Sequence, residues 1–196
     1  MAKSLLGKYL FTFFDDGMTG GIITETEAYN GIVDKASHAY NGRRTARTEI
    51  MYAPGGTAYV YLCYGIHSLF NVVTNKPGVP HAVLIRAIKP THGIELMLKR
   101  RNLLVPNKTL TSGPGTVSQA LGIHYAQSGL SLNGKTIWIE DKKLVPADSE
   151  IRITPRIGVD YAGEDAKLPY RFVWDMPVET VLKKSEHVKP KAVIGS

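Results

Sequence analysis

The sequence has almost no cysteine, since Cys63 is the single one in the chain. One cysteine allows no disulfide within the chain, which is typical of proteins in reducing compartments. No apolar run approaches the ~18 residues that a membrane span needs. Residues 1–8 also lack the long apolar core of a signal peptide. We therefore expect a soluble intracellular protein that does not bind a membrane.

The sequence also lacks the motifs of several common enzyme classes. Its six histidines show neither HExxH nor His-x-His spacing, and Cys63 has no second cysteine with which to share a metal. No P-loop, GxGxxG or GxSxG motif occurs. An acyl- or formyl-transfer enzyme would need such a nucleophile or a carrier site, so this class is disfavoured. We expect neither a metal nor another cofactor.

The overall composition is that of an ordinary globular protein. Hydrophobic residues make up 43% of the 196 residues and charged residues 21%, which excludes a disordered chain. The 19 glycines and 11 prolines predict many turns. The formal net charge of +7 favours a phosphate-rich or acidic partner, although solubility alone could explain it. Without repeats or a linker, residues 1–196 are interpreted as one domain.

Strand-like patterns dominate and do not alternate regularly with helices. Strands are expected at residues 8–14, 20–29, 57–64, 66–74, 82–88, 136–140, 151–153 and 170–174. Short helices are expected at residues 3–6, 45–51, 91–101 and 112–121. This order predicts an α+β fold, in which a mainly antiparallel, curved β-sheet carries short helices at its periphery.

Two of these strands carry chemically useful side chains on one face. Alternation over residues 22–29 places Glu25, Glu27 and Tyr29 on the same side as Ile23. Two carboxylates beside a phenol suit acid–base chemistry, but a solvated face of an edge strand looks the same. The pattern does not distinguish Glu25 from Glu27.

The second strand carries a row of aromatic side chains. Tyr59, Tyr61 and Cys63 share one face of residues 57–64, as in a packed core or in a platform that stacks on a nucleobase. Tyr64 precedes Gly65 at a tight reversal, where core packing explains a bulky ring poorly. An exposed aromatic there could enter a base stack as a wedge.

Two further segments could contact phosphates. Arg43, Arg44 and Arg47 lie close together beside hydroxyl side chains, an arrangement that suits DNA phosphates but also a solvated loop. Ser112 and Gly113 stand at a helix start, where free N–H groups could hold a phosphate or simply cap the helix. We predict DNA contacts for Arg43, Arg47, Ser112 and Gly113.

Taken together, these segments resemble the alkyladenine (3-methyladenine) DNA glycosylase family. The collinear matches are Glu25-Thr26-Glu27-Ala28-Tyr29, His38, Tyr59-Val60-Tyr61, Tyr64-Gly65, Asn71, and the segments AVLIRAIKP, LTSGPGTVSQALGI and PRIGVDYAG. The resemblance covers about residues 4–175. Several long motifs in the same order are specific, whereas any one of them alone is not.

The resemblance implies a monofunctional DNA glycosylase of base excision repair. Such an enzyme flips an alkylated or deaminated purine out of double-stranded DNA and hydrolyses its N-glycosidic bond, leaving an abasic site. No lysine lies among the matched site residues to act as an amine nucleophile, so we expect a monofunctional enzyme without a cofactor. A monomer is expected because base flipping needs only one copy of the protein. For the reaction, it implies that Glu27 is the base that activates water, and that Arg86 and the carbonyl of Ile157 hold this water. For binding, it implies that Tyr29, His38 and Tyr61 are walls around the flipped base. It also implies that Asn71 disfavours guanine and that Tyr64 is the wedge.

A non-catalytic nucleic-acid-binding module is the alternative. The basic loop and the tyrosine rows would suffice for binding, with a steep dependence on salt and no release of a base. Glu27 beside Arg86 argues against this alternative, because a carboxylate near phosphates does not help a protein that only binds.

Overall fold

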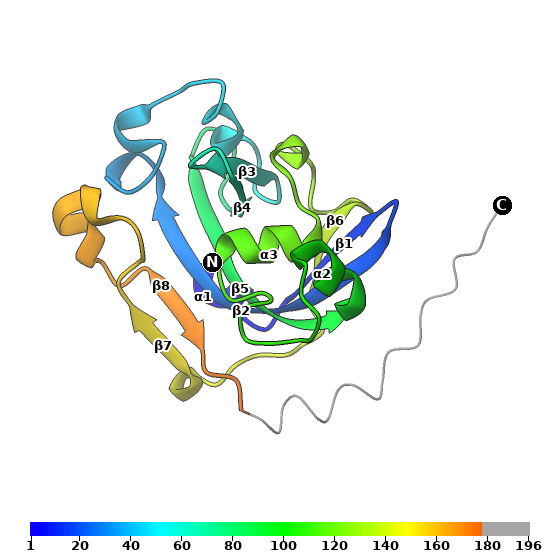
Figure 1. Ribbon diagram of the computed structural model, residues 1–196. Coiled ribbons are helices and arrows are strands. Elements are labelled where there is room, and N and C mark those ends of the chain that lie inside the picture. The colour runs from blue at the N-terminus through cyan, green and yellow to red at the C-terminus, as the bar shows by residue number, and fades with distance from the viewer. Residues whose placement is uncertain (178–196) are drawn as a thin grey trace.

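One curled β-sheet of eight strands organises the protein, as the computed structural model shows for residues 1–177 (Figure 1). The strands are β1 (Tyr9–Phe14), β2 (Gly17–Asn30), β3 (Ala58–Cys63), β4 (His67–Val73), β5 (His81–His92), β6 (Ile137–Glu140), β7 (Ile151–Thr154) and β8 (Arg171–Trp174). The order is β3-β4-β5-β2-β1-β6, while β8 pairs with β2 and β7 with β8. All pairings are antiparallel, which confirms the predicted α+β class. Residues 178–196 of the predicted domain lie outside the described residues.

Short helices surround this sheet. The α-helices are α1 (Ala2–Leu5), α2 (Ile94–Arg101) and α3 (Pro114–Leu121), and single turns or short runs of 3₁₀-helix lie at Gly31–Val33, Tyr40–Gly42, Glu49–Tyr52, Tyr125–Gln127, Asp148–Glu150 and Asp160–Lys167. Within residues 1–177, no helix is long and apolar enough to cross a membrane. The helix predicted at residues 45–51 is wrong, because the chain forms only a 3₁₀ turn that begins at Glu49. Similarly, Thr91 and His92 extend β5 instead of starting a helix, because β5 still pairs with β2 at Gly20.

The long strands β2 and β5 form the centre of the sheet, and their pairing is irregular near Gly20 and again near Glu25. Their register shifts between Ile23 and Glu25 and again between Glu25 and Thr26. Such irregularities increase twist and redirect side chains. The strict alternation predicted over residues 22–29 is therefore interrupted after Ile23, which is fully buried in the main core. Glu25 and Glu27 still share a side, since both contact Arg86 of β5.

The main core lies between the sheet and the α3 helix, which crosses its concave side in Figure 1. Val117 and Leu121 of α3 are fully buried together with Leu10 and Ile85 of the sheet. Burying each such side chain contributes roughly 1.5–3 kcal/mol. Pro114 begins α3, and a left-handed glycine after Leu121 ends it, as is typical of helix termini. This packing fixes the start of α3 beside strand β4.

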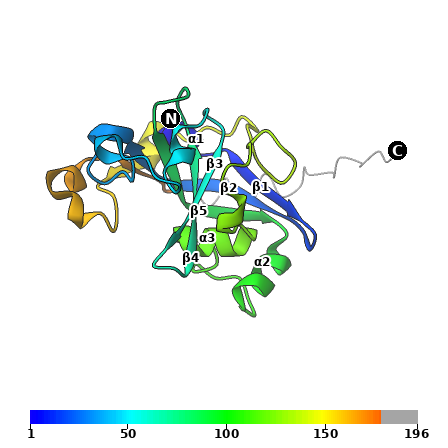
Figure 2. The same ribbon diagram turned by 90° about the horizontal axis from the view of Figure 1, so that it is seen from above.

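Residues 31–52 and residues 157–167 lie side by side at one end of the sheet (Figures 1 and 2). The backbone N–H of Lys35 donates to Asp165 at 2.8 Å, and the hydroxyl of Tyr161 donates to the carbonyl of Ala36 at 3.0 Å. These contacts join two segments that are more than a hundred residues apart in the sequence. Between them and the β3–β4 hairpin, the protein is hollowed into a pocket.

Candidate active site

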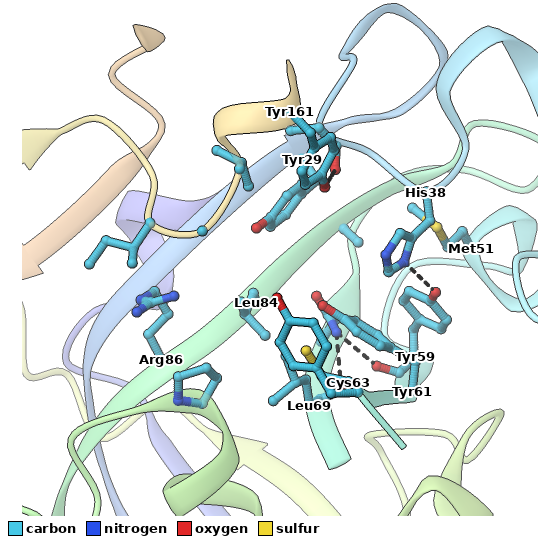
Figure 3. A pocket seen from close by; sticks show the side chains of 18 residues that line it. Tyr29, His38, Met51, Tyr59, Tyr61, Cys63, Leu69, Leu84, Arg86 and Tyr161 are labelled. Carbon is cyan, nitrogen blue, oxygen red and sulfur yellow. Dashed lines mark hydrogen bonds between the residues drawn. The ribbon is translucent and has the colours of Figure 1, made fainter. Parts of the chain in front are cut away.

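A pocket of about 210 Å³ opens between β2, the β3–β4 hairpin and the loop after β7 (Figure 3). Aromatic and aliphatic side chains form most of its wall, among them Tyr29, His38, Met51, Tyr59, Tyr61, Leu69, Leu84, Val159 and Tyr161. The polar groups are few and include Asn71 and Arg86. Ligand sites for drug-sized molecules are larger, roughly 300–1,000 Å³. The pocket therefore suits a group smaller than a drug-sized ligand.

Glu27 lies behind the wall of this pocket and has no exposed surface. Its Oε1 accepts a hydrogen bond from the N–H of Ile157 at 2.8 Å, and its Oε2 accepts one from the hydroxyl of Tyr29 at 3.0 Å. Nη1 of Arg86 is 3.4 Å from Oε1. All three partners line the pocket. Glu27 is thus a carboxylate directly behind the pocket wall.

Burial raises the pKa of Glu27 above its ordinary value of 4.5, because the charged form loses its hydration. Arg86, the N–H of Ile157 and the hydroxyl of Tyr29 act in the opposite direction and favour the charged form. The result is a carboxyl group that accepts a proton more readily than a glutamate at the surface. This is the property that a general base at the pocket would need.

Glu25 has a different environment, although it lies on the same side of β2. Its Oε1 accepts Nε–H groups of Arg86 at 2.8 Å and of Arg171 at 2.7 Å. Two guanidinium groups therefore hold the Glu25 side chain in place. Glu27 contacts three residues that line the pocket. Of the two partners of Glu25, Arg86 lines the pocket and Arg171 does not. The structure thus separates the two glutamates, which sequence alternation could not do.

The loop that brings Ile157 to Glu27 is anchored by a buried ion pair. Arg156 donates to both carboxylate oxygens of Asp34, at 2.6 and 2.9 Å, and both side chains have almost no exposed surface. The guanidinium carbon of Arg156 also lies 4.9 Å from the centre of the Tyr29 ring. The contact of Ile157 with Glu27 is made by its N–H, whereas a role was expected for its carbonyl. The role of that carbonyl stays a prediction.

The side wall of the pocket consists of three connected aromatic rings. Nδ1 of His38 is 2.8 Å from the hydroxyl of Tyr59, and its ring meets that of Tyr61 edge-on with centres 4.6 Å apart (Figure 3). Burial, followed by Arg47 and Arg43, lowers the pKa of His38 to about 4. The imidazole is therefore neutral at pH 7.

Tyr59 and Tyr61 both line the pocket, but they differ in how deeply they are buried. Tyr59 is buried in a core cluster beside Met51. Tyr61 is partly exposed and lies at the pocket. Burial raises the pKa of Tyr61, so its phenol is neutral and offers an electron-rich face.

Asn71 is buried in β4 directly opposite Tyr59 of β3. Its Nδ2 donates to the carbonyls of Tyr59 and Leu69, both at 3.2 Å. Because both partners are acceptors, the amide orientation is determined, with the nitrogen toward the backbone. The side chain lines the pocket in a fixed orientation.

Tyr64 stands at the tip of the β3–β4 hairpin and is 92% exposed. Tyr64 and Gly65 both have positive φ, 51° and 71°, and the N–H of Ile66 donates to the carbonyl of Cys63 at 3.1 Å. The predicted tight reversal is confirmed, and core packing does not explain the Tyr64 ring. Ile66, which sequence reasoning did not single out, is also 75% exposed at this tip.

The predicted DNA contacts lie near the pocket. Arg43 and Arg47 are exposed, but Arg47 also contacts His38, and the neighbouring Arg44 forms an ion pair with Glu49. The basic loop is thus not only solvated, because two of its arginines contact other side chains of the protein. Ser112 and Gly113 precede α3, whose first residue lines the pocket. Their contacts to DNA stay predictions.

Sequence reasoning missed residues that connect distant segments. Asp34, Arg156 and Tyr161 support or line the pocket, and Arg171 holds Glu25. The segment PRIGVDYAG contains Arg156 and Tyr161 and matches a family motif, but no rule of sequence spacing pairs Arg156 with Asp34. Within the described residues, no group of three or more His, Cys, Asp or Glu side chains is placed to bind a metal.

One protein family and several named proteins are similar to this chain over most of its length. The family model described as methylpurine-DNA glycosylase matches residues 1–177. A protein of Chlamydia felis named "Putative 3-methyladenine DNA glycosylase" is 48% identical over 189 residues, covering 96% of this chain and 93% of that protein. Proteins with the same name from Chlamydia abortus and Bacillus cereus are 51% identical over 174 residues (88% and 90% covered) and 47% over 185 residues (89% of each). The chain therefore belongs to the methylpurine-DNA glycosylase family.

Proposed function

We propose that the protein is a monofunctional DNA glycosylase that removes alkylated or deaminated purines from double-stranded DNA and leaves an abasic site. The observation that carries this proposal is Glu27, a buried carboxylate in contact with three residues that line an aromatic pocket. A flipped purine would occupy the pocket, and its sugar would lie toward Glu27. No cofactor takes part in the proposed reaction.

The walls of the pocket suit a damaged purine. Tyr29, His38 and Tyr61 offer aromatic surfaces, and stacking of a base on such a ring contributes about 1–3 kcal/mol. This offsets the few kcal/mol that base flipping costs. The neutral phenols attract a cationic alkylated base through their π-electrons. Asn71, held in one orientation, would disfavour guanine at its amino group.

Hydrolysis follows from the position of Glu27. Its carboxylate takes a proton from water while the water oxygen bonds to C1′ of the sugar, and the electrons of the N-glycosidic bond leave with the base. Negative charge on Glu27 also stabilises the oxocarbenium-like sugar. Because Glu27 has no exposed surface in the free protein, the water must enter at the wall of Tyr29, Arg86 and Ile157. Arg86 and the carbonyl of Ile157 would hold that water.

The DNA would bind across the mouth of the pocket. Tyr64 at the hairpin tip would fill the space that the flipped base leaves, as wedges do in other proteins that distort DNA. Arg43, Arg47, Ser112 and Gly113 would contact phosphates. The net charge of +7 supports this binding. Base flipping needs one copy of the protein, so we propose a monomer.

The test is release of the base from a duplex that contains one hypoxanthine or ethenoadenine, measured without metal. Wild type is expected to release it. Glu27→Gln is expected to lose at least about 100-fold in rate, because general base catalysis contributes about 10²–10⁴-fold, and to keep its affinity for damaged DNA. Glu25→Gln is the matched control and should lose less, because Glu25 has hydrogen bonds to Arg86 and Arg171 but none to Tyr29 or Ile157 of the pocket wall.

Two results would contradict the proposal. Equal losses of base-release rate in Glu27→Gln and Glu25→Gln would contradict the assignment of Glu27 as the general base. No release by any protein from these duplexes or from methylated genomic DNA, together with tight and salt-dependent binding, would favour the non-catalytic binding module.

A further inference from the structure

The guanidinium group of Arg47 contacts two of the pocket walls at once. Its Nη2 is 3.1 Å from Nε2 of His38, and its central carbon lies 4.7 Å from the centre of the Tyr61 ring. Arg47 does not line the pocket, and together with Ile50 it borders a separate hollow that Tyr61 also lines. The arginine therefore stands outside the wall that the two rings form.

Hydrogen-bond chemistry determines the state of His38 from this contact. A guanidinium group only donates hydrogen bonds, so Nε2 of His38 must accept and cannot carry a proton. The ring is then neutral with its proton on Nδ1, which donates to the hydroxyl of Tyr59 at 2.8 Å. A protonated His38 would direct an N–H group at the N–H group of Arg47.

We propose that Arg47 is a positioning residue of the base pocket, which keeps His38 in the neutral Nδ1–H form and holds Tyr61 from its outer side. This proposal rests on the proposed function, because it concerns the walls of the pocket in which the damaged base would lie. Arg47 would act through His38 and Tyr61, without touching the base.

The groups that face His38 support this assignment. Tyr59 and Tyr61 face the imidazole from β3. Arg43 and Arg47 face it from the loop that follows the 3₁₀ turn at Tyr40–Gly42. The two phenols are neutral and the two arginines are positive, so no carboxylate among these groups favours the imidazolium. Burial and the two arginines lower the pKa of His38 together.

A neutral His38 matters most for substrates that carry a positive charge. An imidazolium in the wall would repel a cationic base such as 3-methyladenine, whereas a neutral base such as hypoxanthine would be affected less. The positive charge of Arg47 does not change with pH, so by keeping His38 neutral Arg47 would keep the acceptance of cationic bases constant at mildly acidic pH. Without it, acceptance of cationic bases would depend on pH.

The experiment observes His38 directly in the free protein. Long-range ¹H–¹⁵N NMR spectra of the imidazoles report the tautomer and the pKa, and a His38→Asn variant assigns the signals. In wild type we expect the proton on Nδ1 and a pKa of about 4. In Arg47→Met we expect the Nε2–H form to appear and the pKa to rise by about half a unit or more toward the ordinary 6.5.

Two further variants separate positioning from simple loss of charge. Arg47→Lys keeps a charged donor and should restore the Nδ1–H form in large part. Arg44→Met removes the same charge from the same loop, but Arg44 contacts Glu49 and Tyr52 instead of His38. Its His38 signals should match those of wild type. A wild-type proton on Nε2, or identical His38 signals in wild type and Arg47→Met, would overturn the proposal.

Base release gives the second measurement. Between pH 8 and 5, the ratio of 3-methyladenine to hypoxanthine release should fall in Arg47→Met as the pH is lowered, by about twofold at pH 5 if the pKa of His38 reaches about 5. The ratio should not change in Arg44→Met. An unchanged ratio despite altered His38 signals would overturn the link to cationic bases. If no protein releases a base, the proposed function fails, and the NMR result still decides the role of Arg47.

Discussion

Asp34 and Arg156 form a bidentate ion pair that is almost completely buried and joins two segments 122 residues apart in the sequence. Arg156 also lies against the outer face of Tyr29 and precedes Ile157, whose N–H contacts Glu27. The pair thus determines where the loop after β7 meets β2. In the proposed mechanism, it orients one wall of the pocket and one partner of the general base.

The first prediction concerns the stability of this anchor. Asp34→Asn leaves the buried charge of Arg156 without compensation, which should lower the free energy of unfolding by about 3–5 kcal/mol. Asp175→Asn breaks the exposed pair with Arg152 and should cost no more than about 1 kcal/mol. Urea unfolding of both variants measures the difference. Similar losses would show that the Asp34–Arg156 pair is no more important than a surface pair.

The second prediction concerns the exposed wedge. Tyr64→Ala should leave the melting temperature nearly unchanged, because the ring is 92% exposed, and should speed dissociation from damaged duplex DNA. Phe13→Ala, which removes a 58% exposed ring near the end of β1, is the control and should not change dissociation. A large loss of thermal stability in Tyr64→Ala would support a packing role.

The third prediction is a pH dependence of base release. Glu27 must be ionised to accept a proton, and burial raises its pKa above 4.5. The rate of hypoxanthine release should therefore fall as the pH is lowered through that raised pKa, at a higher pH than an ordinary glutamate would give. Single-turnover rates between pH 4.5 and 8 measure this acidic limb. A rate that stays constant down to pH 4.5 would contradict the assignment of Glu27 as the base.

The fourth prediction connects the same pKa to stability. A carboxyl group whose pKa is raised in the folded state stabilises the fold below its unfolded pKa, and this contribution is lost as the pH rises through the folded pKa. Ionised Glu27 therefore costs stability at neutral pH. Glu27→Gln should unfold at an equal or higher temperature than wild type at pH 7–8, and its advantage should shrink as the pH approaches 4.5. A marked destabilisation at pH 8 would indicate a structural role.

Local patterns predicted much of the fold. The strand at residues 57–64 and the reversal at Tyr64-Gly65 follow from aromatic, β-branched and glycine residues that act over a few positions. The start of α3 follows from Pro114 in the same way. The irregular pairing around Glu25 could not be predicted, because it depends on how β2 meets β5 and β8 at once.

In the candidate site too, some features follow from local sequence and others depend on distant segments. Motifs placed Glu27, Tyr29 and Tyr61 on the correct strands, because alternation along a strand is a local property. The choice between Glu25 and Glu27 depends on Arg171, which lies about 146 residues further along the chain. Such partners are known only once distant strands are paired.

The fixed backbone at the tip of the β3–β4 hairpin has a consequence for how the proposed enzyme would search DNA. Tyr64 and Gly65 hold their left-handed backbone in the free chain, so the direction of the Tyr64 side chain from the backbone is set before any encounter with a duplex. A preorganised backbone loses little conformational entropy when the side chain it carries enters a base stack. Each base pair could then be tested during a short contact, and most intact pairs could be passed without a conformational change of the protein.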